Sequence, residues 1–138
     1  MKILLATHGH MASGMESTIE VLFNEVPENL EIFDAYVNDD NLDDKIMKFL
    51  NNTDQREVKI LLSDLYGGSV CQQMSKYMSY ENTYVVTGAN LGLLMTLLTA
   101  DGELTKEELK DIIEDTKQFI CIVDENEVSK SVVEDEIF

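Results

Sequence analysis

The chain has few basic side chains. Lysine and arginine together number 10 against 27 acidic residues, so the net charge of the 138 residues is −17 at pH 7. Nucleic acids and anionic membranes are bound largely through Lys and Arg, so this balance argues against both as partners. Only one arginine, Arg56, is present. Sites that hold phosphate with several arginines are therefore excluded.

Long apolar runs, prolines and cysteines are also scarce. No apolar run approaches the length that spans a bilayer, and the N-terminus turns polar too early for a signal peptide. Cys71 and Cys121 belong to no local motif, and we expect both to be reduced in a cytoplasmic protein. The chain length suits one domain with its own core. We expect this domain over residues 1–123, followed by an acidic tail, 124–138, of unassigned structure.

Apolar runs typical of strands alternate with segments of helical periodicity. The strand-like runs cover residues 3–6, 30–33, 58–62, 83–86 and 119–123. Between them, apolar residues recur at helical spacing, as in Met15, Ile19 and Leu22. Ser13 with Glu16 has the spacing of a capping box near the start of this first helix. The alternation predicts an α/β domain with an open, mostly parallel sheet and helices on both faces.

Both histidines follow the first predicted strand, in the sequence Thr7-His8-Gly9-His10. Loops at the carboxyl ends of parallel strands are where ligands bind in such sheets. Histidine is also the side chain best suited to carry a proton or a phosphoryl group near neutral pH. This turn is therefore a candidate site.

A second polar turn follows the third predicted strand, from Asp64 to Ser69, and includes Gly67 and Gly68. In a sheet of order 2-1-3-4, strands one and three are neighbours, so their loops flank the same crevice. Asp64 would then lie beside His8 and fix its tautomer, near backbone amides that favour an anion. Each feature alone also fits an ordinary turn, so the residues leave a phosphate site and a plain loop both open.

The two turns together resemble the enzyme IIA domain of the mannose family in the bacterial phosphotransferase system (PTS). The likeness covers about residues 1–123, in element order and length. A third family turn is matched by Gly88-Ala89-Asn90, although Gly92 and Val70 stand where the family usually has proline. The resemblance also implies a fifth, antiparallel edge strand at 119–123, exchanged between the subunits of a homodimer.

The resemblance further implies a phosphocarrier that needs no cofactor or metal. Such domains accept a phosphoryl group from the protein HPr and pass it to an enzyme IIB domain, while membrane IIC and IID subunits carry the sugar. His8 matches the phosphorylated residue and Asp64 the carboxylate that orients its ring. Gly9, Gly68 and Ser69 match the surroundings of the phosphoryl group. His10 falls at a variable position and is expected on the surface, and the sequence does not identify the sugar.

Four other functions share features with this sequence. A histidine phosphatase needs an arginine where Thr7 stands, and a response-regulator receiver needs acidic residues after the first strand; neither fits. A metal- or anion-binding module using His8, His10 and Asp64 would need better-defined ligand spacing. The phosphocarrier subunit of a dihydroxyacetone kinase shares the fold and the histidine and remains the related alternative.

Overall fold

A four-stranded parallel sheet, in the order β2-β1-β3-β4, forms the centre of the molecule. The computed structural model describes residues 1–125. The strands are β1 (Lys2–His8), β2 (Leu30–Ala35), β3 (Lys59–Ser63) and β4 (Thr83–Thr87). The strand order and the parallel pairing confirm the predicted sheet.

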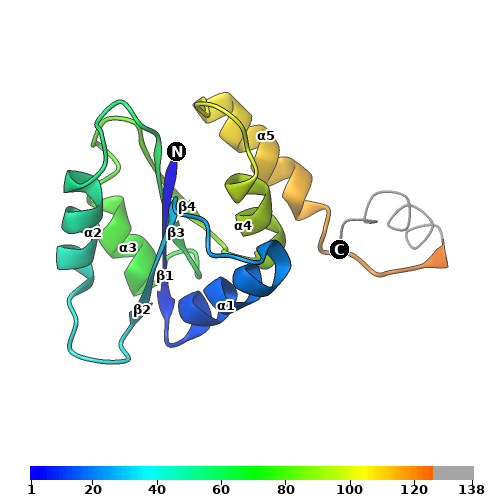
Figure 1. The fold of residues 1–138 in the computed structure, drawn as a ribbon, viewed down its shortest axis with the longest axis horizontal. Helices are drawn as coiled ribbons and strands as arrows, with labels where there is room; N and C mark the ends of the chain where they lie inside the picture. Colours follow the sequence, from blue (N-terminus) through cyan, green and yellow to red (C-terminus); the bar gives the residue numbers. More distant parts are fainter. Residues whose placement is uncertain (126–138) are drawn as a thin grey trace.

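Helices cover both faces of this sheet (Figure 1). They are α1 (Met11–Phe23), α2 (Leu42–Asn51), α3 (Ser69–Ser75), α4 (Leu91–Leu98) and α5 (Lys106–Lys117). Helices α2 and α3 lie on one face, and α1, α4 and α5 lie on the other (Figure 1). The α/β class predicted from the sequence is confirmed.

The inner strand β1 explains why the sheet is covered twice. Ile3 and Leu5 belong to the apolar cluster on the side of α1 and α4, whereas Leu4 and Ala6 belong to the cluster on the side of α2 and α3. All four side chains are fully buried. Successive side chains of a strand point to opposite faces, so a continuous apolar run requires a layer of helices on each side.

The starts of two helices differ in whether a residue close in sequence caps them. Thr105 caps α5 by accepting the amide of Glu108, and its hydroxyl donates to the Glu108 carboxylate. The expected box at Ser13 and Glu16 is wrong, because α1 already begins at Met11. The Ser13 amide is instead satisfied by Asp34, at the end of β2. A partner distant in sequence therefore replaces the local cap.

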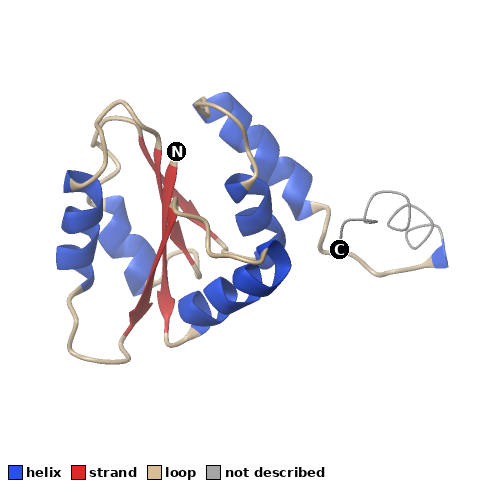
Figure 2. Cartoon of the chain, viewed as in Figure 1, coloured by secondary structure: helices blue, strands red, loops and turns tan. Residues whose placement is uncertain are grey.

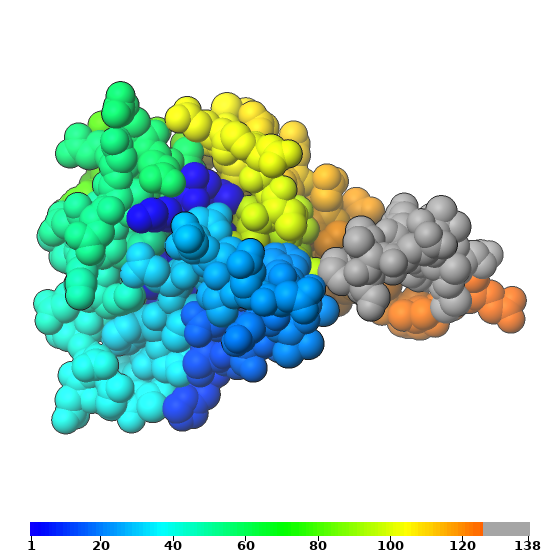
Figure 3. All heavy atoms as spheres, in the orientation of Figure 1, coloured from blue at the N-terminus to red at the C-terminus, as the bar shows by residue number. Residues whose placement is uncertain are grey.

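The predicted fifth strand is absent from the described chain. After α5, residues 119–123 form a turn, a bend and irregular chain that leads away from the sheet (Figure 1). In Figure 3 the orange atoms of this part of the chain project from the body of the molecule. Phe119 still contacts the body: a Cβ on Gly92 would lie 2.8 Å from its ring, so this side chain occupies space beside α4. A strand needs an adjacent edge to pair with, and α5 does not return the chain to one.

Candidate functional site

The parallel strands bring the two predicted turns together at one edge of the sheet, towards which the red arrows point in Figure 2. In the register of β1 and β3, Ala6 lies opposite Ser63. His8 and Asp64 therefore both lie at the ends of neighbouring strands. Ser69, the first residue of α3, follows on the same side.

His8 and Asp64 are joined by two hydrogen bonds. The Asp64 Oδ2 atom lies 2.9 Å from Nδ1 of the His8 ring and accepts the His8 backbone amide at 3.0 Å. The His8 side chain is 41% exposed, whereas that of Asp64 is only 14% exposed. The carboxylate thus holds the ring through Nδ1, while the His8 side chain as a whole stays partly exposed.

The environment of Asp64 keeps its carboxyl group ionised. Burial raises the pKa of Asp64, but the backbone and ring hydrogen bonds from His8 outweigh burial, so the pKa lies below its usual value. An ionised carboxylate only accepts hydrogen bonds, so Nδ1 of His8 carries the proton. In the neutral ring, Nε2 then has a free electron pair and is the nucleophilic atom.

Ser69 lies at that nucleophilic atom. Its Oγ is 3.2 Å from Nε2 of His8. The adjacent Gly68 is close to the ring, because a Cβ there would lie 3.4 Å from His8 Cε1 and 3.3 Å from the Leu65 Cβ. The small residue at position 68 leaves room for the imidazole, while Ser69 supplies a hydroxyl beside Nε2.

The backbone amides of the two predicted glycines are already used within the fold. The Gly9 amide donates to the carbonyl of Ala35, and the Gly68 amide donates to the carbonyl of Leu65. Gly9 has a φ of +62°, a conformation that a side chain would strain. Both glycines therefore shape the turns, and their role in holding a phosphoryl group stays a prediction.

His10 forms a second pair with a carboxylate. Its Nδ1 lies 3.2 Å from Oδ2 of Asp34, but its side chain is 75% exposed. Burial raises the pKa of Asp34. The hydrogen bonds from Ser13 and, after them, from His10 lower this pKa by more, so it lies below its usual value. His10 lies on the surface, as predicted, although its carboxylate partner was not foreseen.

Two residues of this edge were missed in the sequence, Asp34 and Tyr36. Both lie at or just after the end of β2, which neighbours β1 on the side opposite β3. The hydroxyl of Tyr36 lies 2.7 Å from Ser69 Oγ. The rule that placed Asp64 beside His8 applies equally to β2, so strand order could have pointed to this third loop.

Other features of the described chain do not suggest a metal site or a membrane span. Within residues 1–125, no three His, Cys, Asp or Glu side chains are grouped as metal ligands, and His8 and His10 contact different carboxylates. None of the helices in this range is long and apolar enough to cross a membrane. A metal-binding module therefore gains no support.

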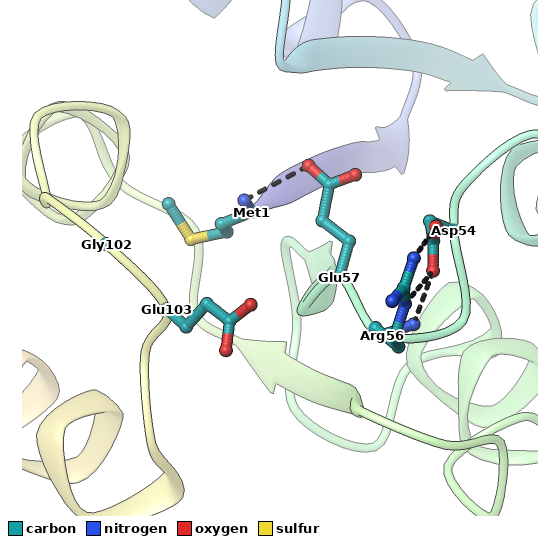
Figure 4. Close-up of a pocket in the computed structure, with 6 residues that line it drawn as sticks. All are labelled: Met1, Asp54, Arg56, Glu57, Gly102 and Glu103. Atoms are coloured by element: carbon teal, nitrogen blue, oxygen red, sulfur yellow. Dashed lines mark hydrogen bonds and ion pairs between the residues drawn. The ribbon is translucent and has the colours of Figure 1, made fainter.

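A surface hollow lies at the amino ends of the strands (Figure 4). His8 lies at the other end of β1. The single arginine reaches it, but its guanidinium is hydrogen-bonded to Asp54. The hollow is lined by Met1, Asp54, Arg56, Glu57, Gly102 and Glu103. None of these residues belongs to the candidate site, which lies at the carboxyl ends of the strands.

A family model matches most of the chain. Residues 2–116 match the model of the EIIA-man family, described as the PTS system fructose IIA component. No curated protein matches the chain.

Solved structures share the fold along nearly the whole chain. The mannose/sorbose specific IIA subunit from Enterococcus faecalis is 21% identical, with a TM-score of 0.75 over 89% of this chain and 94% of that one. EIIA from Streptococcus agalactiae is 21% identical, with a TM-score of 0.73 over 89% and 95%. The PTS IIA protein associated with the fucose utilization operon of Streptococcus pneumoniae is 25% identical, with a TM-score of 0.69 over 88% and 91%.

Proposed function

Since the chain belongs to the EIIA-man family of PTS IIA components, we propose that it is a cytoplasmic phosphocarrier that uses His8. It accepts a phosphoryl group from phospho-HPr and passes it to an enzyme IIB domain, which serves membrane IIC and IID subunits. The observation that carries this proposal is the Asp64–His8–Ser69 arrangement. It leaves Nε2 nucleophilic, on a side chain that is 41% exposed at the carboxyl edge of the sheet.

The transfer needs only a bond exchange at phosphorus. The Nε2 electron pair of His8 attacks the phosphorus atom, a new P–N bond forms, and the P–N bond to the donor histidine breaks with its electrons returning to that ring. The Nδ1 proton stays between His8 and Asp64. The ring becomes positively charged when phosphorylated, and the adjacent carboxylate stabilises that charge.

Apolar side chains around the site support a protein as donor and acceptor. Met11, Tyr36, Val37, Leu65 and Tyr66 are exposed on the segments that follow β1, β2 and β3. Tyr66 is 86% exposed and Leu65 is 60% exposed. Exposed apolar groups gathered at one edge are typical of surfaces that bind another protein.

The test is reconstitution with enzyme I, HPr and phosphoenolpyruvate, followed by intact mass. We expect one acid-labile phosphoryl group on the chain, and its loss when a IIB domain is added. Omitting HPr should prevent the gain. A wild-type chain that takes up no phosphoryl group in the complete mixture would refute the proposal.

We also propose that the chain forms a homodimer through residues 119–123. Ile120, Ile122 and Val123 are exposed in the described structure, Ile122 by 89%. An exposed apolar segment invites pairing with a second chain, and a symmetric exchange closes on itself. Light scattering should show a dimer for the full chain and a monomer for a version ending at Lys117. A monomeric full chain, or a truncated version that stays dimeric, would contradict this assembly.

A further inference from the structure

Tyr36 contacts both the nucleophilic histidine and the serine beside it. Its hydroxyl lies 2.7 Å from Ser69 Oγ, and its ring centroid lies 5.4 Å from that of His8, with the ring planes inclined at 42°. The side chain is nevertheless 63% exposed. It therefore covers one side of the site without being part of the hydrophobic core.

The backbone of Tyr36 adopts an unfavourable conformation. Its φ is +66°, in the left-handed region that bulky side chains rarely adopt. Such strain persists only where surrounding contacts impose it, and it is concentrated at functional sites. Here the neighbouring Ala35 is fixed, because it is buried and its carbonyl accepts the amide of Gly9. The left-handed turn at residue 36 directs the phenol across the sheet edge towards Ser69.

The direction of each hydrogen bond follows from the ionised Asp64. Because Nδ1 of His8 donates to that carboxylate, Nε2 can only accept in the neutral ring. The Ser69 hydroxyl then donates to Nε2, and its oxygen is left to accept from the phenol of Tyr36. The three groups form one chain of hydrogen bonds, from Tyr36 through Ser69 to His8.

We propose that Tyr36 is a positioning residue for phosphoryl transfer at His8, acting through the hydroxyl of Ser69. This inference rests on the proposed phosphocarrier function. When Nε2 binds phosphorus, the Ser69 hydroxyl loses its acceptor and turns to donate to a phosphoryl oxygen. The phenol continues to donate to Ser69 Oγ and keeps that hydroxyl beside His8. No proton is gained or lost in this exchange of acceptors.

The test measures the rate of phosphorylation in wild type, Tyr36→Phe, Ser69→Ala and the double variant. Two donors are compared, phospho-HPr and phosphoramidate. With phosphoramidate the donor P–N bond breaks, ammonia leaves, and no partner protein docks. The loss of one hydrogen bond predicts a rate about 3- to 10-fold lower for Tyr36→Phe with either donor. In the Ser69→Ala background the same change should have no effect.

Tyr80→Phe is the matched control. Tyr80 lies between α3 and β4, at the amino end of β4, and its hydroxyl donates to Met47 Sδ at 3.8 Å. This change also removes one phenol hydrogen bond, but away from His8, so the variant should transfer at the wild-type rate. The ¹⁵N chemical shift of His8 Nε2 should move in Tyr36→Phe and not in Tyr80→Phe, whereas a merely structural role for Tyr36 would move only the urea midpoint.

Each of the other outcomes refutes either the role of Tyr36 or the proposed phosphocarrier function. If wild type is phosphorylated and Tyr36→Phe matches it in rate and in ¹⁵N shift, this inference alone is wrong. A rate lowered with phospho-HPr but not with phosphoramidate makes Tyr36 a docking residue instead. Additive losses in the double variant refute an action through Ser69. A wild type that takes up no phosphoryl group refutes both the proposed function and this inference.

Discussion

The two histidines of the chain form nearly the same pair with a carboxylate, yet their surroundings differ. In each pair a ring Nδ1 lies about hydrogen-bond distance from an aspartate Oδ2, 2.9 Å for His8 and 3.2 Å for His10. His8 is less exposed, and its Nε2 faces Ser69. Within residues 1–125, the Nε2 of His10 makes no hydrogen bond, and its ring is 75% exposed. The paired carboxylate is therefore common to both rings, and the contact of Nε2 with Ser69 is what distinguishes His8, the proposed phosphoryl acceptor, from His10.

The largest expected effect separates the two rings directly. His8→Ala should abolish phosphorylation by phospho-HPr because it removes the attacking nitrogen. His10→Ala should retain it, because the hydrogen bond of that ring within residues 1–125 is to Asp34 and not to His8, Asp64 or Ser69. Intact mass measured after a fixed incubation distinguishes the two. Phosphorylation that survives the loss of His8, or that disappears with His10, would reverse the assignment.

The next effect concerns the two carboxylates. Asp64→Asn should slow phosphorylation roughly 100-fold, because the ring loses the group that fixes its tautomer and orientation. Asp34→Asn, the matched change in the other pair, should alter the rate less than about twofold, because Asp34 is hydrogen-bonded to His10 and Ser13 and not to His8. Rates come from quenched time courses with phospho-HPr in excess. Equal rates for the two variants would remove the special role of Asp64.

Much of this site could be predicted from the sequence, because it depends on strand order. Apolar runs identified β1 and β3, and parallel strands of the order 2-1-3-4 must place the ends of these two strands side by side. That geometry alone brought His8 to Asp64. The same geometry applies to β2, which neighbours β1 on its other side and places Asp34 and Tyr36 at this edge, but neither residue type stands out in the sequence there.

Other features depend on contacts that no local pattern encodes. The start of α1 was misplaced because the amide of Ser13 is satisfied by Asp34, 21 positions away. Residues 119–123 are apolar enough for a strand, but within the described chain no sheet edge meets them. The left-handed backbone of Tyr36 is unusual for tyrosine, so composition gives no sign of it.

A smaller effect comes from two glycines, one beside each histidine pair. A Cβ on Gly68 would meet the Leu65 carbonyl at 3.2 Å and His8 Cε1 at 3.4 Å, whereas one on Gly14 in α1 would meet nothing within 4 Å. Gly68→Ala should displace the ring and slow phosphorylation several-fold. Gly14→Ala should leave the rate unchanged and raise the free energy of unfolding by about 0.5–1 kcal/mol. Unchanged transfer in Gly68→Ala would show that the ring tolerates the shift.

The smallest effect is the one in which the two pairs should behave alike, the pH dependence of stability. The pKa of Asp64 and that of Asp34 are both lowered in the fold. A carboxyl group whose folded pKa is depressed stabilises the fold above its unfolded pKa, and this contribution is lost as pH falls through the folded value. The difference in unfolding free energy between wild type and either Asp→Asn variant should therefore be larger at neutral pH than in acid.

Urea unfolding across the acid range measures this difference, with Asp111→Asn, an exposed carboxylate on α5, as the control for losing one charge. Between acid and neutral pH, the free energy of unfolding should rise less in Asp64→Asn and in Asp34→Asn than in that control. A pH-independent difference for Asp64 would mean that its carboxylate does not hold the His8 loop in the folded state. If instead both carboxylates stabilise the fold while only Asp64 governs transfer, the contacts of Nε2 distinguish the two histidines, and the charge beside Nδ1 does not.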